Sequence, residues 1–353
     1  MFNAKNIDEL IRKGLKDEIF PGAAISIGDK NGELFRAAYG LRQILPHELP
    51  LEGNTLFDVA SLTKLFTSLI ALKLIQDNRL NLSDTLSKFF DAPSDKSAIT
   101  IQHLMTHTSG IAAHEHVYNL VEKPSDTAAF ILNMELLNTP GKAVVYSCLG
   151  YILLGKICEM LGGNTIDNLA KQWLFKPMEL DSAAYNPSNK HTFAATEFDA
   201  TTDKWLCGVV HDENARFLDG ISGNAGIFAN IEDMARFAMM LTNKGVIEGK
   251  VIIEKGLFEE AIKNLTPHCP EGRGLGFEVK SGVLISCGNN FSVGSYGHTG
   301  FTGTSLWVDI ETGLYVVLLT NRVHPTRDNA KHIPFRRELH DLCAAEYRRS
   351  VEV

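Results

Sequence analysis

The sequence has no long apolar run and no excess of positive charge. No stretch of about 18 or more apolar residues occurs, so no membrane-spanning helix is expected. Lysine and arginine together number 34 against 42 aspartates and glutamates, and no basic run follows the pattern of a phosphate-binding surface. Neither a membrane nor nucleic acid is therefore an expected partner.

The chain also lacks the cysteine patterns of metal sites and disulfide frameworks. Its six cysteines are scattered without C-x-x-C or Cys/His spacing, which predicts reduced thiols, no bound metal and no cofactor. His103 and His107 have the i, i+4 spacing of a helical metal pair but no H-E-x-x-H glutamate, so they are interpreted as hydrogen-bonded core or cap histidines. Residues 1–20 lack the basic-then-apolar pattern of a signal peptide, and a cytoplasmic location is expected unless an export segment was removed.

Turn and strand signals near both ends of the chain predict one antiparallel sheet. "GAAISIGDKNGELFRAAYG" places Asn31-Gly32 between two strand-like segments, and "GTSLWVDIETGLYVVLLTNR" joins two β-rich runs at residues 311–313. Short amphipathic and helical patterns lie near residues 7–15 and 333–349. Because an isolated hairpin is only marginally stable, the strands from both ends are expected to share one sheet.

The middle of the chain, from about residue 62 to 240, reads as mostly helical. Its segments carry apolar residues at three- and four-residue spacing and end near Gly or Asn. The predicted fold class is therefore α/β (α+β), with an antiparallel sheet flanked by helices. Residues 1–85 and 220–353 form the sheet domain, residues 86–219 form a mostly helical inserted region, and the active site lies in the cleft between them.

A serine and a lysine share one face of an otherwise apolar helix. In "DVASLTKLFTSLIALKLI", Lys64 follows Ser61 by three residues, about one helical turn. Burial is expected to lower the pKa of Lys64, which would let the amine serve as the base that a serine nucleophile requires. The alternative is an N-cap serine beside a lysine whose stem packs and whose amine reaches solvent.

Two further motifs decide between these readings. Tyr146 ends an extended stretch in "PGKAVVYSCLGYILLGKICEM", and His298-Thr299-Gly300 lies in the glycine-rich strand "GSYGHTGFTGTSLWVD". Together with Ser61-Leu62-Thr63-Lys64, in this order and at these separations, they resemble the serine β-lactamase and penicillin-binding-protein superfamily. The similarity is greatest to the branch of class C β-lactamases, family VIII carboxylesterases and D-aminopeptidases. It extends to "TIQHLMTHTSGI" and "GRGLGFEV", and so covers nearly the whole chain.

The resemblance implies a role for each matching position. Ser61 is the nucleophile that forms an acyl-enzyme, Lys64 its base partner and Tyr146 a phenol that shares the proton transfer. The backbone N–H groups of Ser61 and Phe301 are the implied oxyanion hole. Cys148, His298, Thr299 and Gly300 are the implied substrate-binding residues. Apart from the resemblance, the acidic segment 211–220 reads as a loop and is expected to border the cleft through "GISGNAGIF".

Two positions depart from the family pattern. Cys148 stands where Tyr-x-Asn motifs carry asparagine, and a thiol is a much weaker donor and acceptor than an amide. His298 stands where β-lactamases usually carry lysine, and histidine is largely neutral at pH 7. Both departures favour a small ester or amide over a β-lactam as the substrate.

Three functions are thus in competition. The leading one is a serine hydrolase, an esterase or D-aminoacyl amidase or peptidase, acting through a Ser61 acyl-enzyme on a small-molecule ester, amide or β-lactam. The second is a true class C-like β-lactamase or D,D-carboxypeptidase. The third is a catalytically idle protein of this fold that binds a ligand or partner. The oligomeric state and the natural substrate stay open.

Overall fold

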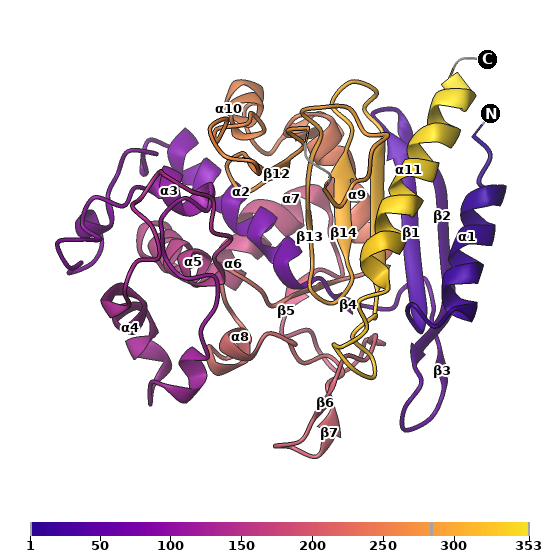
Figure 1. Cartoon of the computed structure of the whole chain (residues 1–353), viewed down its shortest axis with the longest axis horizontal. Helices are drawn as coiled ribbons and strands as arrows, with labels where there is room; N and C mark the ends of the chain where they lie inside the picture. The colour runs from indigo at the N-terminus through magenta and orange to yellow at the C-terminus, as the bar shows by residue number, and fades with distance from the viewer. Residues whose placement is uncertain (1, 283–284, 352–353) are drawn as a thin grey trace.

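The computed structural model of the protein describes residues 2–282 and 285–351 (Figure 1). An antiparallel sheet with helices on both faces lies beside a mainly helical region, and both chain ends lie on the sheet side (Figure 1). The predicted fold class is confirmed. No described helix is both long and apolar enough to cross a membrane.

Strands and helices occur in runs along the chain. The strands are β1 (Gly22–Asp29), β2 (Gly32–Gln43), β3 (Leu49–Pro50), β4 (Phe57–Asp58), β5 (Ala184–Tyr185), β6 (Phe198–Asp199), β7 (Lys204–Trp205), β8 (Ile227–Ala229), β9 (Val246–Ile247), β10 (Lys250–Val251), β11 (Gly272–Arg273), β12 (Glu278–Val279), β13 (Tyr296–Thr299), β14 (Ser305–Val308) and β15 (Tyr315–Thr320). The α-helices are α1 (Lys5–Lys16), α2 (Thr63–Gln76), α3 (Ile101–Met105), α4 (Thr127–Asn133), α5 (Cys148–Gly162), α6 (Ile166–Ala170), α7 (Lys176–Met178), α8 (Glu213–Phe217), α9 (Ile231–Thr242), α10 (Lys255–Ala261) and α11 (His332–Val351).

The main sheet joins the two ends of the chain. Its strand order is β11-β12-β13-β14-β15-β1-β2-β3, and β1 pairs with β15 so that Ala23 lies opposite Thr320. Both predicted hairpins form: β1 and β2 are joined by a turn at Lys30 and Asn31, with Gly32 opening β2, and β14 and β15 are joined by a turn that includes residues 311–313. Gly313 has a φ of +73°, a conformation that favours glycine in such a turn. The predicted shared sheet is confirmed.

Side-chain alternation buries both faces of this sheet. Ile25 and Ile27 pack with α1 and α11 in one hydrophobic cluster. Val317 and Leu319 point the other way and pack in the cluster that holds α2, α5 and α9. The central strands are therefore uniformly buried, which explains why their sequence reads as a continuous apolar run.

Helix α2 is apolar on all sides because it is enclosed by protein. Its residues 63–72 are all buried, and it packs against α5. A small second sheet, β4-β8-β5, holds the segment that leads into α2, because Phe57 of β4 pairs with Ala229 of β8. Strands of two or three residues are too short to show a period, so this sheet was not predicted. The boundaries of the sheet domain and the inserted region stay a prediction.

Acid should destabilise the fold through His340 on α11. This ring is fully buried, its Nδ1 lies 3.1 Å from the Ser286 carbonyl, and burial lowers its pKa to about 3. Because the folded pKa lies below the unfolded value of about 6.5, this stabilisation is complete above pH ~6.5 and is lost as the pH falls toward 3. Between pH 7 and 5 the wild type should lose about 2 kcal/mol more unfolding free energy than His340→Gln. Urea titrations at both pH values measure this difference, and an equal loss in the two proteins would contradict it.

Candidate active site

A buried carboxylate shapes the approach to Ser61. Asp58 ends β4, and its Oδ1 accepts the N–H of Ala60 at 2.8 Å while its Oδ2 accepts the N–H of His211 at 2.7 Å. Burial raises the pKa of Asp58, and these hydrogen bonds oppose that rise. Ala60 has a φ of +49°, a strained conformation for a residue with a side chain. The short 3₁₀ helix Ala60–Leu62 then leads into α2 with Ser61 partly exposed.

Lys64 is completely buried beside Ser61. Its Nζ donates to Ser61 Oγ at 2.9 Å and to the Asn224 carbonyl at 2.9 Å, and lies 3.5 Å from Cys148 Sγ. The predicted contact between the two side chains is therefore present. The alternative, in which the lysine amine reaches solvent, is wrong.

The expected direction of the Lys64 pKa is also wrong. Burial lowers the pKa of Lys64, but the electrostatic effects of the neighbouring Cys148 thiol and Tyr146 phenol raise it, and the net direction is upward. The cause is the pair of acidic groups that the fold brings to the amine, one from α5 and one from the segment before it. Lys64 therefore reaches Ser61 as a hydrogen-bond donor carrying a positive charge.

Tyr146 lies between cations and aromatic rings. The Lys64 Nζ is 5.1 Å and the Arg273 guanidinium 5.6 Å from its ring centre, and the His107 ring centre is 4.5 Å away. Burial raises the pKa of Tyr146, whereas the Lys64 charge lowers it in part. His107 is fixed because its Nδ1 accepts the N–H of Ser147 at 2.9 Å, as a hydrogen-bonded core histidine should be.

The third motif lies on β13, opposite the nucleophile. The His298 ring is buried, its Nδ1 is 2.8 Å from the Thr299 carbonyl, and its centre is 5.7 Å from that of Tyr146. Burial first, and then the charges of Lys64 and Arg273, lower the pKa of His298 to about 3. His298 is thus neutral behind the cavity, while Thr299 and Gly300 line it.

Two hydroxyl groups tie the turn after β13 to the nucleophile segment. Thr302 donates to the Asp58 carbonyl at 2.8 Å and Thr304 to the Val59 carbonyl at 3.0 Å. Gly300 permits this approach, because a Cβ there would lie 2.6 Å from the Val59 carbonyl oxygen. Ser61 and Phe301 consequently line the same cavity, and neither backbone N–H has a protein acceptor among the described hydrogen bonds.

The cavity they line has a volume of about 580 Å³. Of the predicted site residues, Lys64 and His298 lie behind its wall, and the others line it: Ser61, Tyr146, Cys148, Thr299, Gly300 and Phe301. The segment 211–220 does border the cavity, as expected, through His211, Asp212 and Glu213. Within the part of the chain that the structure describes, no group of three or more His, Cys, Asp and Glu side chains could hold a metal ion.

A basic wall completes the cavity and was missed from the sequence. It consists of Arg322, Arg327 and Arg336, and the ring of His332, whose pKa burial lowers to about 3, lies beside them without a charge. Arg336 is 7% exposed, and its Nε has no partner among the described residues. Burial lowers the pKa of Arg336 to about 10, so its charge persists at neutral pH. The sequence carried no signal for this wall beyond arginines just after an apolar strand and at the start of a helix.

The fold and this cavity define a class of protein. An antiparallel sheet flanked by helices, with Ser-x-x-Lys at the start of a buried helix and Tyr and His-Thr-Gly segments beside it, is the architecture of β-lactamases and penicillin-binding proteins. The chain belongs to the Beta-lactamase family, whose model matches residues 7–341.

Relatives and solved structures agree with this assignment. The chain is 30% identical to an N-acetylmuramyl-L-alanine amidase of Bacillus subtilis (strain 168), over 91% of this chain and 81% of that protein. It is 28% identical to a putative D-alanyl-D-alanine carboxypeptidase of Escherichia coli (strain K12), over 94% and 86%. The structure of EstCE1, described as a hydrolase with promiscuous acyltransferase activity, has a TM-score of 0.78 at 19% identity and covers 96% of this chain and 98% of its own. These names point to a hydrolase of the serine β-lactamase and penicillin-binding-protein type.

The neutrality of His298 can be measured directly. Because burial and two nearby cations lower its pKa to about 3, its imidazole should stay unprotonated from pH 8 down to about pH 4. Heteronuclear NMR of protein labelled with ¹⁵N-histidine follows the ring nitrogens, and His298→Gln assigns the signal. An inflection of that signal between pH 6 and 7, where a free histidine titrates, would contradict the burial argument.

Proposed function

We propose that this protein is a serine hydrolase that forms an acyl-enzyme on Ser61 and acts on a small ester or amide. The observation that carries the proposal is the 2.9 Å contact from the buried Lys64 Nζ to Ser61 Oγ at the wall of an open cavity. The hydrogen-bond partners of the buried Lys64 Nζ are Ser61, Cys148 and the Asn224 carbonyl, none of them a carboxylate; a charge buried in this way is costly, and such arrangements are typical of functional sites. The open cavity argues against an idle site.

The reaction follows from the positions of these groups. Ser61 Oγ attacks the substrate carbonyl carbon as its proton passes to the phenolate form of Tyr146, which the adjacent Lys64 ammonium stabilises. The carbonyl oxygen becomes an oxyanion that accepts hydrogen bonds from the N–H groups of Ser61 and Phe301. Tyr146 then returns the proton to the leaving group as the C–O or C–N bond breaks. Water attacks the acyl-enzyme by the same path in reverse and releases the acid.

The cavity walls favour an anionic acyl or leaving group. Cys148 offers only a weak hydrogen bond where the family pattern has an amide, which disfavours the side-chain amide of penicillins. Arg336 offers an unpaired Nε, and a buried unpaired donor gains from an anion. Esters and amides that carry a carboxylate fit both features.

A D,D-carboxypeptidase or β-lactamase is the second candidate. The observation that favours it is the same basic wall, since peptides ending in D-alanine and β-lactams both present a carboxylate. The printed names of several relatives, putative D-alanyl-D-alanine carboxypeptidases, agree with it. Substrate turnover, measured as follows, separates it from the leading proposal.

Covalent labelling tests the nucleophile. Intact-protein mass spectrometry after separate exposure to a fluorophosphonate, a penicillin and p-nitrophenyl butyrate should show one adduct on the wild type and none on Ser61→Ala. The reagents that label or turn over, together with D-alanine release from a D-alanyl-D-alanine peptide, rank esterase against carboxypeptidase. The absence of any adduct on the wild type would favour the idle alternative.

Lys64 and Tyr146 should behave as one proton-transfer unit. Lys64→Ala and Tyr146→Phe should each slow acylation by roughly 10²- to 10⁴-fold, and the double variant should lose much less than the product. Stopped-flow acylation by p-nitrophenyl butyrate measures this loss. Lys73→Ala is the matched control, because Lys73 lies on the same helix but donates to the Ile252 carbonyl at 3.1 Å. Fully multiplicative losses would count against a shared unit.

Cys148 should influence the choice of substrate. Cys148→Asn restores an amide beside Lys64 and should raise the rate of penicillin acylation about tenfold or more while ester turnover changes little. The kcat/KM values for a penicillin and for p-nitrophenyl butyrate measure the effect. Cys269→Asn, a change outside the cavity, is the control. An equal change for both substrates would remove Cys148 from substrate selection.

A further inference from the structure

Phe301 is held from several sides although it is half exposed. The Arg322 guanidinium lies over its ring, 4.5 Å from the centre, and the Nε of Arg322 donates to the Phe301 carbonyl at 2.9 Å. The His211 ring stacks on the Phe301 ring with centres 5.5 Å apart, and the Arg327 guanidinium is 5.8 Å from the same ring centre. A ring that is half exposed gains little from burial, so these contacts serve mainly to hold Phe301 in one position.

Arg322 is itself fixed by backbone acceptors. It is 5% exposed, and its Nη1 donates to the carbonyls of Arg327 at 2.7 Å and Asn329 at 3.3 Å. The described hydrogen-bond partners of its guanidinium are all backbone carbonyls rather than carboxylates. Because a guanidinium is planar and its donors are rigidly arranged, carbonyls on two segments fix its orientation over Phe301.

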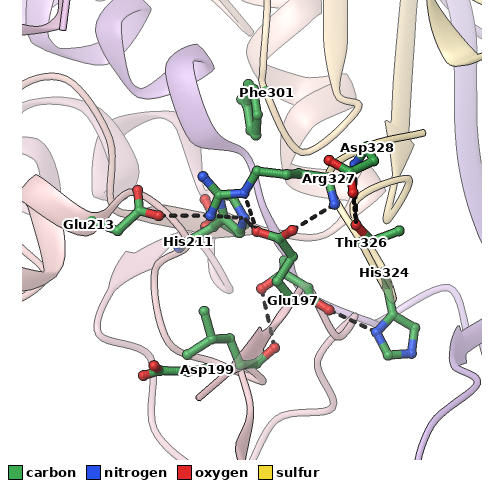
Figure 2. Close-up of polar contacts among 12 residues, drawn as sticks. Glu197, Asp199, His211, Glu213, Phe301, His324, Thr326, Arg327 and Asp328 are labelled. Atoms are coloured by element: carbon green, nitrogen blue, oxygen red, sulfur yellow. Dashed lines mark hydrogen bonds and ion pairs between the residues drawn. The ribbon is translucent and has the colours of Figure 1, made fainter. Parts of the chain in front are cut away.

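Arg327 anchors that second segment to the other side of the cavity. Its Nε donates to Glu197 at 2.5 Å, its backbone N–H to Glu197 at 2.6 Å, and a terminal nitrogen to Glu213 at 2.7 Å (Figure 2). The Nε2 of His211 lies 2.7 Å from Glu197 (Figure 2). Burial raises the pKa of Glu197, but its contacts with His211 and Arg327 outweigh this and lower the pKa to about 2, so Glu197 stays charged.

The two ends of this network come from distant parts of the chain. Glu197, His211 and Glu213 precede β8, whereas Arg322 and Arg327 follow β15. The His211 backbone is also tied to Asp58, three residues before Ser61. One connected set of contacts therefore runs from the nucleophile segment through the cavity rim to the Phe301 carbonyl.

We propose that Arg322 is a positioning residue for the oxyanion hole, and that the ion pairs of Arg327 with Glu197 and Glu213 hold it in place. This inference rests on the proposed function. Gly300 N–H, bound to the Thr304 carbonyl at 2.8 Å, fixes the chain on one side of Phe301, and Arg322 fixes its carbonyl on the other. The Phe301 N–H between these points is then held toward Ser61 before substrate arrives. An oxyanion donor contributes most when it needs no reorganisation during the reaction.

The test compares Arg322→Met, Arg322→Lys and Arg327→Met with the wild type. Steady-state hydrolysis of p-nitrophenyl butyrate gives kcat and KM, and phenylboronic acid, which forms a tetrahedral adduct with an active serine, reports on the oxyanion hole. Arg322→Met should lower kcat about 10- to 100-fold with little change in KM, and should weaken phenylboronic acid binding in parallel. Arg322→Lys should not restore kcat, because an ammonium cannot reproduce the planar, rigid arrangement of guanidinium N–H donors. Arg327→Met should act in the same direction but less.

Arg236→Met is the matched control. Arg236 also pairs with two glutamates, Glu179 and Glu248, and donates to the Met178 carbonyl, but it lies outside the cavity. Thermal midpoints of all variants report on folding, and Arg327→Met decides the matter if the Arg322 variants do not fold.

The outcomes separate this inference from the proposed function. If the wild type reacts on Ser61 but the Arg322 and Arg327 variants match Arg236→Met, the positioning role is overturned and the hydrolase stands. A rise in KM at unchanged kcat also overturns it, because Arg322 would then only bind substrate. A wild type that forms no Ser61 adduct overturns both.

Discussion

The buried ammonium of Lys64 is the constraint on which the rest of the site depends. A fully buried cation must be compensated by nearby acceptors, and here those acceptors come from three separate segments: Ser61 in the 3₁₀ helix before α2, Asn224 before β8 and Cys148 at the start of α5. Helix α2 can therefore occupy the middle of the molecule only when all three segments are in place. The same contacts determine the charge beside Ser61, since the acidic neighbours outweigh the effect of burial on the Lys64 pKa.

A second set of contacts couples the two chain ends to this helix. The turn after β13 is tied through Thr302 and Thr304 to the residues just before Ser61. β13 belongs to the sheet in which β1 and β15 pair, so the position of this cavity wall depends on the pairing of the two chain ends. The proposed oxyanion hole, Ser61 and Phe301, thus combines a helix start and a strand end that lie 240 positions apart in the sequence. Such a distance is bridged only by a cooperative fold.

Many family members share this fold, but the side chains that line this cavity depart from the family pattern. Cys148 and the neutral His298 remove polar recognition that the family pattern supplies, while the arginines add positive charge at another wall. Substrate preference is decided by such substitutions on a common scaffold. Here they favour a ligand with an anionic group and weaken the argument for a penicillin side chain, which is why an ester or amide with a carboxylate fits best.

The sequence by itself determined the hairpins at Asn31-Gly32 and residues 311–313, the terminal helices and the Ser61–Lys64 contact. Turn residues and helical periodicity act over a few positions, so local patterns report them. The family motifs added Tyr146 and the segment from His298 to Phe301. Only the tertiary structure decided the upward pKa of Lys64, the burial of the His298 ring, the short β4-β8-β5 sheet and the arginine wall. Each of these depends on charges or strands brought together from distant segments, and no local pattern encodes that proximity.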